Sequence, residues 1–349
     1  MGRDRHPSGV YVLELGGQDD AFAAREAASA ASDVTLLAPG MAAARGVTDR
    51  VARLAFTRRA SDLVGTCDPD PESAVALLAA AGLERTGSVA VRAVDVRGST
   101  GVDTRRVERD LGAVLVERGF TVDLEDPDHE LRALFADAAG DADGDTPGRT
   151  CALGWLAAES VRDFGDRRPT DRPFFQPGSM DPLEARAVAN LAGARPGRCV
   201  LDPMCGTGGV LLEAALVGAD VLGGDRQVRM VAGTRENLAH GLGPARPSDE
   251  RYPAPGDWGV YRGDAAHLPV RQVDAVVFDA PYGRQSKIAG DLADLVAGTL
   301  AAAREVAPRT VLVADRPWVE AARDAGWTVD ARFERRVHRS LVRHVYLLE

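Results

Sequence analysis

A glycine-rich turn close to several acidic residues is the part of this sequence best suited to bind a ligand. The turn, Asp202-Pro-Met-Cys-Gly-Thr-Gly-Gly209, follows the apolar run 199–201 and precedes an apolar stretch that starts at Val210. This order predicts a strand, a tight turn and a helix, so that a ligand can approach the backbone and meet the N–H groups at the helix start. The spacing Asp-x-x-x-Gly-x-Gly differs from the dinucleotide pattern Gly-x-Gly-x-x-Gly.

Two further acidic residues follow predicted strands. Asp225 comes after a Leu-Gly-Gly run, and Asp264 lies in an Arg-Gly-Asp-Ala run. A carboxylate at Asp225 can accept hydrogen bonds from both hydroxyl groups of a ribose, and one at Asp264 can accept from an adenine amino group. Together with Asp202, they place acids at three successive strand ends, which predicts a site for a ligand that contains a nucleoside.

The fourth predicted strand, 273–278, ends in Asp279-Ala280-Pro281-Tyr282. The amino nitrogen of a nucleobase is a weak nucleophile, because its lone pair is delocalised into the ring. The Asp279 carboxylate and the Ala280 carbonyl can accept hydrogen bonds from such an amine and orient it, and Tyr282 offers a face on which a flipped-out base can stack. Pro281 stiffens the turn. These four residues are the candidate catalytic residues, and a plain strand-to-loop turn is the alternative.

The elements that must position these residues alternate regularly from residue 198 onward. Alternating strands and helices are typical of a doubly wound parallel sheet, whose ligands bind at the carboxyl ends of the strands. The last two predicted strands, 327–333 and 341–348, can pair as an antiparallel hairpin. We therefore expect an α/β fold with a Rossmann-like, doubly wound C-terminal sheet and a terminal antiparallel hairpin, preceded by α+β units.

The first half of the chain holds no catalytic constellation. Strands are expected at 10–15, 33–37, 51–56, 89–96 and 131–135, and a Pro- and Arg-rich stretch follows the second unit. Four parts are predicted: an N-terminal α/β (ferredoxin-like) unit over 1–65, a second unit over 66–162, a linker over 163–180 and the catalytic domain over 181–349.

The composition is that of a water-soluble globular protein. Of the 349 residues, 45% are hydrophobic and 27% are charged, and no apolar run approaches the roughly 20 residues that a membrane span needs. The start of the chain leads into no signal-peptide core, so we expect a cytoplasmic protein. The four cysteines form no Cys-x-x-Cys pair, which argues against structural zinc or a disulfide framework.

The charge distribution leaves room for a nucleic-acid partner. The net charge is −10, but the excess lies in residues 66–165, with 20 acidic and 10 basic residues, whereas residues 166–349 hold 24 of each. The densest basic segment is 332–344, for which a solvated hairpin is the default reading. Beside a base-modifying site, its arginines suit backbone phosphates. They are Arg332, Arg335, Arg336, Arg339 and Arg343.

Several of these patterns resemble those of known enzymes. The glycine turn resembles motif I of the S-adenosylmethionine-dependent methyltransferases. The run from Asp279 to Tyr282 resembles the (Asp/Asn)-Pro-Pro-(Tyr/Phe) signature of enzymes that methylate exocyclic amino groups of bases, with Ala280 in place of the first proline. The runs 91–98, 104–118 and 122–127 look like parts of the THUMP domain, which grips the acceptor end of tRNA. A ferredoxin-like packing module without RNA contact is the alternative for that unit.

The resemblance implies a cofactor, S-adenosyl-L-methionine, and a set of contacts. In amino-methyltransferases a segment like 173–180 precedes motif I and covers the cofactor, which implicates Phe175, although Phe174 and Phe175 suit a core anchor equally well. RNA contacts are implied at Arg97 of the THUMP-like unit and at Arg335, Arg336, Arg339 and Arg343. The implied cofactor-binding residues are Phe175, Asp202, Gly206, Thr207, Gly208, Asp225, Asp264 and Asp279.

Taken together, the patterns look like those of the archaeal THUMP-containing tRNA guanine-N2 methyltransferases that act on guanine 10 and often add two methyl groups. This resemblance implies direct in-line methyl transfer to N2 with no metal and no covalent intermediate, and it is compatible with a monomer. Alternatives are a tRNA guanine-6 N2-methyltransferase, a DNA or rRNA amino-methyltransferase, and a non-enzymatic RNA-binding protein. The last would have lost the glycine turn or Asp279, and both are intact.

Overall fold

The computed structural model describes residues 9–138, 148–243, 250–281, 291–338 and 341–349. The chain forms two compact units, residues 1–161 and residues 162–349, which we call the N-terminal and C-terminal units. In the described part of the chain, none of the helices combines the length and the apolar character that crossing a bilayer requires.

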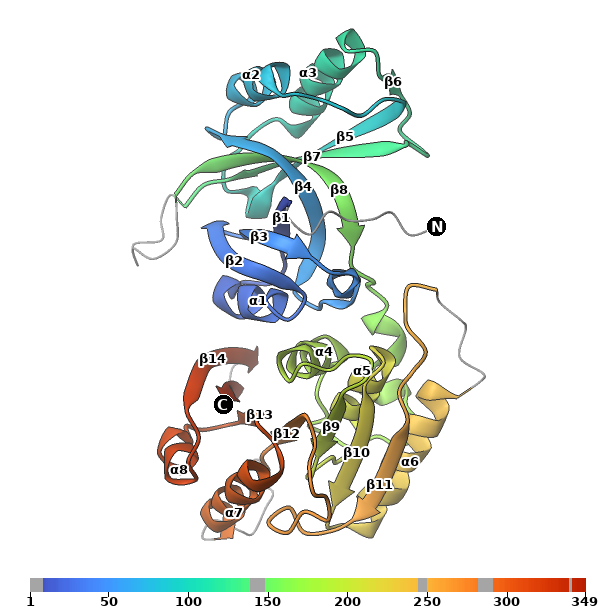
Figure 1. Ribbon diagram of the computed structural model, residues 1–349, viewed down its shortest axis with the longest axis vertical. Coiled ribbons are helices and arrows are strands. Elements are labelled where there is room, and N and C mark those ends of the chain that lie inside the picture. The colour runs from blue at the N-terminus through green and yellow to red at the C-terminus, as the bar shows by residue number, and fades with distance from the viewer. Residues whose placement is uncertain (1–8, 139–147, 244–249, 282–290, 339–340) are drawn as a thin grey trace. The chain divides into compact units, whose positions relative to one another are not determined.

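One mixed sheet runs through the whole N-terminal unit, in the strand order β2-β3-β1-β4-β8-β7-β5-β6 (Figure 1). The long strand β4 pairs with β1 on one side and with β8 on the other. The boundary expected after residue 65 lies inside β4, so the two predicted units share this sheet. Its strands are β1 (Val10–Leu15), β2 (Ala31–Ala38), β3 (Met41–Val47), β4 (Thr57–Cys67), β5 (Ser88–Asp95), β6 (Thr121–Val122), β7 (His129–Ala136) and β8 (Thr150–Glu159).

Two features of this sheet differ from the sequence prediction. The strand expected at 51–56 is wrong, because Asp49–Arg53 forms a 3₁₀ turn and β4 starts only at Thr57. Strands β3, β4, β6 and β8 were not predicted. The sequence of β3 has few of the β-branched residues that favour strands, and it is extended because it pairs with both β1 and β2.

The α-helices of the N-terminal unit begin at aspartate caps, each of which accepts a hydrogen bond from the backbone N–H three residues further on. For the longest helix, Asp103 accepts from the N–H of Arg106 at 3.2 Å. Leu78, Leu111 and Leu115 are fully buried against the sheet, and Figure 1 shows α2 and α3 on the same face of β5 and β7. The helices are α1 (Asp20–Ala27), α2 (Pro71–Ala80) and α3 (Thr104–Glu117).

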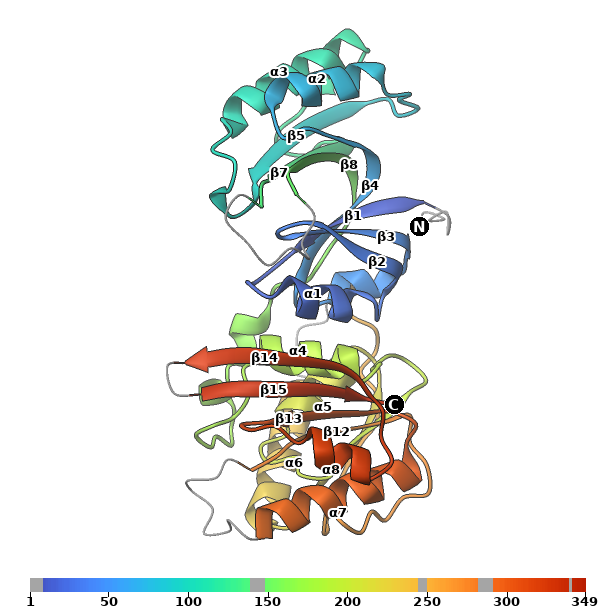
Figure 2. The same ribbon diagram turned by 90° about the vertical axis from the view of Figure 1, so that its left-hand side faces the viewer.

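The C-terminal unit confirms the predicted doubly wound sheet. Its order is β11-β10-β9-β12-β13-β15-β14; the first five strands run parallel, and β15 pairs antiparallel with β13 and β14 (Figure 2). The strands are β9 (Cys199–Asp202), β10 (Asp220–Asp225), β11 (Trp258–Arg262), β12 (Ala275–Asp279), β13 (Thr310–Ala314), β14 (Val329–His338) and β15 (Leu341–Leu348). The helices are α4 (Pro182–Leu191), α5 (Gly209–Leu216), α6 (Val228–Leu242), α7 (Asp291–Val306) and α8 (Val319–Asp324).

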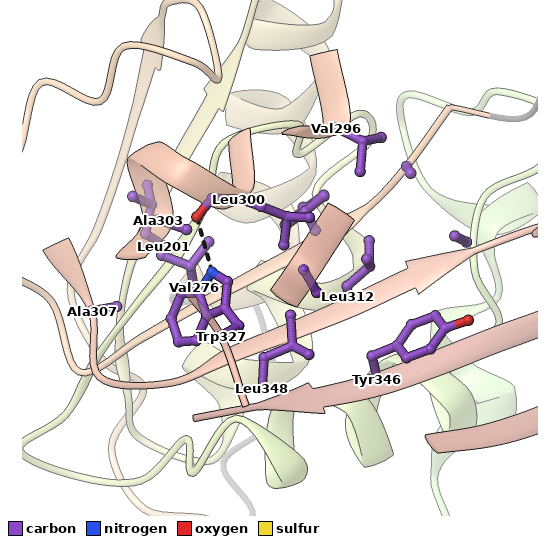
Figure 3. Close-up of a cluster of buried hydrophobic side chains, with 14 of the residues drawn as sticks. Leu201, Val276, Val296, Leu300, Ala303, Ala307, Leu312, Trp327, Tyr346 and Leu348 are labelled. Carbon is purple, nitrogen blue, oxygen red and sulfur yellow. Dashed lines mark hydrogen bonds between the residues drawn. The ribbon is translucent and has the colours of Figure 1, made fainter. Parts of the chain in front are cut away.

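A hydrophobic core between α7 and the sheet fixes this unit (Figure 3). Val296 and Leu300 of α7 pack against Val276 of β12, and the indole of Trp327 closes the cluster. The Trp327 Nε1–H donates to the carbonyl of Leu300 at 2.9 Å, so its polar atom is satisfied inside the core. This core supports β12, the strand that ends at Asp279.

The segment expected as a linker is packed into the C-terminal unit. Arg167 forms ion pairs with Asp163 at 2.8 Å and with Glu213 at 2.9 Å. Glu213 also pairs with Arg186 of α4 at 2.7 Å, and both of these side chains are fully buried. The Tyr252 hydroxyl donates to Asp163 at 2.9 Å. Residues 163–167 therefore belong to the fold that carries the candidate site.

Candidate active site

A cavity of about 190 Å³ lies at the carboxyl ends of the central parallel strands. It is lined by residues 176–180, most of the turn 202–210, Met230 and Asp279. The site predicted from the glycine turn and the site predicted from the end of the fourth strand thus share one cavity. Asp225 ends the neighbouring strand β10, and its carboxylate touches the same turn.

The glycines of the turn are needed for its backbone shape. Gly206 and Gly208 have φ of +53° and +78°, a region that side chains rarely adopt. A Cβ on Gly208 would lie 2.7 Å from Cγ2 of Thr234, whereas a Cβ on Gly206 would meet nothing closer than the Met204 carbonyl at 3.9 Å. The missing side chain at Gly206 therefore leaves space for a ligand next to the start of α5.

Asp202 is almost completely buried beneath the turn and accepts a hydrogen bond from the N–H of Met204 at 3.0 Å. Burial raises the pKa of the Asp202 carboxyl well above its ordinary value. The N–H of Met204 opposes this, and the negative charges of Asp279 and Asp225 raise that pKa further. A ligand that brings positive charge to this cavity would relieve the repulsion among the three carboxylates.

Asp225 holds the turn from the side. Its carboxylate accepts from the N–H of Gln227 at 2.8 Å and from the N–H of Gly206 at 3.2 Å. Burial raises the pKa of Asp225, and the two backbone donors act in the opposite direction. Each oxygen keeps a lone pair, so the carboxylate can still accept from ribose hydroxyl groups.

The end of β12 places two of the four candidate catalytic residues at the cavity or beside it. Asp279 is half-buried and lines the cavity, and Ala280 is buried with its N–H bonded to the carbonyl of Val313 at 2.8 Å. Pro281 is exposed. Tyr282 lies outside the residues that the structure describes.

Asp264 lies apart from this cavity, after β11. Its side chain is about half exposed and accepts from the N–H of Ala266 at 3.0 Å. That position leaves the carboxylate accessible to a ligand that extends beyond Asp225, as the sequence pattern predicts, but the structure joins only Asp202, Asp225 and Asp279 through the turn and its cavity.

The segment before α4 is fixed by its first aromatic residue. The Phe174 ring packs on α6, where a Cβ on Gly233 would come within 2.0 Å of it, and the Arg229 guanidinium lies 5.5 Å from its ring centroid. Phe175 is 42% exposed and does not line the cavity. The core anchor is therefore Phe174, and Phe175 is the ring left accessible.

Sequence reasoning missed Asn237 of α6. Its buried amide accepts from the N–H of Phe174 at 2.9 Å and donates to the carbonyls of Phe174 and Thr207 at 2.8 and 2.9 Å. The available signal was an asparagine on the apolar face of an amphipathic helix, where a polar side chain requires partners.

The arginines predicted to bind RNA are placed in different surroundings. Arg335 pairs with Glu184 of α4 at 2.8 Å, Arg336 is exposed, and Arg343 is only 5% exposed. The burial of Arg343 disfavours the predicted phosphate contact at this position, which stays a prediction. In the N-terminal unit, Arg97 binds Asp20 at 3.1 Å and the Gly17 carbonyl at 3.0 Å. Arg339 lies outside the described residues.

The site can therefore hold a cationic ligand that contains a nucleoside and can orient a hydrogen-bond donor. The glycine turn and Asp225 form a cradle for a nucleoside-type ligand, and the carboxylates suit a positively charged group near Asp202 and Asp279. These features fit S-adenosylmethionine, which carries a sulfonium and an ammonium group. The Asp279 carboxylate lines the same cavity and has several lone pairs with which to accept hydrogen bonds.

Comparisons with known proteins agree with this geometry. A family described as "RMKL-like, methyltransferase domain" matches residues 169–344. The tRNA (guanine(10)-N2)-dimethyltransferase of Methanothermobacter thermautotrophicus is 35% identical over 85% of this chain and 83% of its own length. The Pyrococcus abyssi protein of the same name is 30% identical over 75% and 74%. The tRNA (guanine(6)-N2)-methyltransferase of Thermus thermophilus is 32% identical over 58% and 53%.

Proposed function

The chain belongs to the tRNA (guanine(10)-N2)-dimethyltransferase family, and from this premise we propose that it methylates the exocyclic N2 amino group of a guanine in tRNA with S-adenosylmethionine as cofactor. The observation that carries the proposal is the cavity shared by the glycine turn and the end of β12. It puts the cofactor-binding pattern and the amine-orienting pattern side by side.

The proposed chemistry assigns a role to each part of the site. The turn 206–208 and Asp225 would hold the nucleoside end of the cofactor, and Asp202 would supply negative charge for its sulfonium and ammonium groups. When bound, S-adenosylmethionine supplies an electrophilic methyl group on a sulfonium, so the reaction needs no metal. The Asp279 carboxylate and the Ala280 carbonyl accept hydrogen bonds from the N2 amine. They orient a nitrogen that is otherwise a weak nucleophile.

Within tRNA, we propose guanine 10 as the target, with one methylation followed by a second. The support is that two relatives, which the chain matches over 83% and 74% of their length, are both named tRNA (guanine(10)-N2)-dimethyltransferase. Guanine 6 is the second candidate, because the Thermus thermophilus relative with that name is of similar identity over a shorter stretch. The second methylation requires only that the monomethylated amine fit the same acceptors.

We further propose that residues 66–162 act as a THUMP-like unit that holds the acceptor end of tRNA. The support is the resemblance of runs 91–98 and 104–118, which the structure describes as a strand with a short turn and a helix. A cytoplasmic location and a monomeric state complete the proposal. The substrate class supports the location, and the family resemblance is compatible with a monomer.

Methyl transfer to in-vitro transcripts tests this function. The full chain is incubated with S-adenosylmethionine carrying a labelled methyl group and a tRNA transcript, and the product nucleosides are identified by mass spectrometry. We expect N2-methylguanosine and N2,N2-dimethylguanosine. Transcripts with guanine 10 or guanine 6 replaced, each with its pairing base changed to match, locate the target. Three results would contradict the proposal: methylation of a DNA duplex offered in place of tRNA, methylation of an atom other than guanine N2, or no methylation of the wild-type tRNA transcript.

A further inference from the structure

The cavity has two walls that come from separate parts of the chain. Residues 176–180 form one wall, and the turn 204–207 forms the other. The first wall precedes α4 and the second follows β9, so the backbone between them runs through a whole helix and a strand. Their separation must therefore be fixed by contacts across the gap.

Asn237 makes these contacts from α6, behind the cavity. It bonds both backbone groups of Phe174 and also the carbonyl of Thr207, with distances between 2.8 and 2.9 Å. A primary amide can donate twice and accept twice, so both of its donor hydrogens have partners here. At 2% exposure the side chain has no access to water that could replace these bonds.

Three further contacts act in the same direction. The Oγ atoms of Ser179 and Thr207 lie 3.0 Å apart, which joins the walls at the cavity itself. The Phe174 ring occupies the space that Gly233 leaves by having no side chain. Thr234, one turn before Asn237 on α6, donates to the carbonyl of Gly206 at 2.7 Å. One helix therefore holds both walls.

We propose that Asn237, assisted by Ser179, is a positioning residue for cofactor binding: it locks the 174–180 segment to the glycine turn and thereby sets the width of the cavity. Asn237 does not line the cavity. It acts through the backbone of Phe174 and Thr207 and touches neither the cofactor nor the base. This inference rests on the proposed use of the cavity for S-adenosylmethionine.

The experiment compares Asn237→Asp with Glu236→Gln in the full chain. An aspartate has the same shape as asparagine and keeps the oxygen that accepts from the Phe174 N–H. It replaces the donor NH₂ group with an oxygen that faces the carbonyl oxygens of Phe174 and Thr207. Glu236 is its exposed neighbour on α6 and serves as the matched control. We expect the Kd for S-adenosylmethionine, measured by calorimetry, to rise about tenfold in Asn237→Asp. It should stay within about twofold in Glu236→Gln.

Kinetics and hydrogen exchange separate positioning from a general loss of stability. In Asn237→Asp the KM for the cofactor should rise about tenfold, whereas kcat at saturating cofactor should change less than about threefold. Amide exchange should accelerate over residues 174–180 and in the turn 204–207, and should be unchanged over β14. A variant with lower Tm but wild-type Kd and wild-type exchange over these two segments would overturn the inference.

Ser179→Ala provides the second test and applies even if Asn237→Asp does not fold. It removes the contact between the walls without altering α6, and we expect a rise in Kd of about threefold. A Kd equal to that of the wild type would overturn the inference. Failure of the wild-type protein to bind S-adenosylmethionine would contradict the proposed function instead, so the two failures are distinguishable.

Discussion

The carboxylates of Asp202 and Asp279 end two adjacent parallel strands, β9 and β12, and line the same cavity. Asp202 lies beneath the glycine turn and is almost fully buried, whereas Asp279 is half-buried at the rim. Their negative charges oppose each other and contribute to the raised pKa of Asp202. A site of this kind favours a positively charged ligand near the two carboxylates.

The raised pKa of Asp202 predicts a specific pH dependence of stability. The pKa of Asp202 in the folded protein lies above the value of about 3.9 expected in the unfolded chain. The contribution of such a carboxyl to the free energy of unfolding is fully present below the unfolded pKa and is lost as pH rises through the folded pKa. Asp202→Asn removes this loss and keeps the acceptor for the Met204 N–H. The cofactor-free variant should therefore become more stable than wild type as pH rises from about 4 to 8, as measured by urea denaturation. A stability difference that does not vary with pH would contradict the prediction.

Asp225 should contribute to cofactor affinity rather than to folding. Asp225→Ala is expected to weaken S-adenosylmethionine binding by roughly tenfold to a hundredfold, because charge-assisted hydrogen bonds are worth about 1.5–3 kcal/mol. The matched control is Asp220→Ala at the other end of β10, where the carboxylate accepts from the N–H of Asp257 at 2.9 Å. Calorimetry measures the Kd for S-adenosylmethionine in both folded variants. A Kd in Asp225→Ala equal to that of the wild type would show that Asp225 does not contact the cofactor.

The C-terminal unit should bind cofactor without the N-terminal unit, provided that the fragment includes Arg167. A fragment of residues 162–349 keeps the ion pairs of Arg167, whereas one that starts at Arg172 loses them and leaves Glu213 with fewer partners in a fully buried position. We expect the shorter fragment to be less stable by about 3–5 kcal/mol in denaturant titrations. Equal stabilities would show that residues 162–171 are a simple linker.

The longer fragment also tests the proposed division of labour. Residues 162–349 should bind S-adenosylmethionine with near full-length affinity but lose most methyl transfer to tRNA, because the THUMP-like unit is proposed to hold the acceptor end. Methylation of tRNA by this fragment at the full-length rate would show that the N-terminal unit is not the anchor.

Arg336 is an exposed arginine of the basic hairpin that has the access needed for a phosphate contact. Arg336→Ala should weaken tRNA binding and lower the slope of log K against log salt by about one. Arg343→Ala should leave this slope unchanged, because Arg343 is buried. Titrations at several salt concentrations compare the two variants. Equal slopes in wild type and Arg336→Ala would remove this arginine from the interface.

The sequence was informative where a local pattern determines both structure and chemistry. Asp202 with its glycines predicted the turn, and regular alternation predicted the parallel sheet and the terminal hairpin, all of which the structure confirms. These features depend on short-range sequence rules, namely positive φ at glycine and the period of the apolar residues.

Features that depend on long-range pairing were not predictable in the same way. Strand β3 is extended because two neighbours pair with it, and Asn237 acquires its role from residues 30 and 63 positions away in the sequence. The basic run suggests phosphate contacts for Arg335 and Arg343, yet these residues are partners in the register of β14 and β15 and share one face. The sequence shows that Arg335 and Arg336 point to opposite faces of the strand, but it does not show which of the two faces is buried.

The most direct test of the account is a comparison of wild type, Asp279→Asn and Asp279→Ala in single-turnover methyl transfer to saturating tRNA. The Ala variant should keep its affinity for S-adenosylmethionine and lose roughly 10²–10³ in rate, because an amine with a delocalised lone pair depends on a preorganised acceptor. The Asn variant should lie between the two, since an amide oxygen still accepts one hydrogen bond. An Ala variant that transfers methyl groups at nearly the wild-type rate would contradict the assignment of this strand end as the catalytic one.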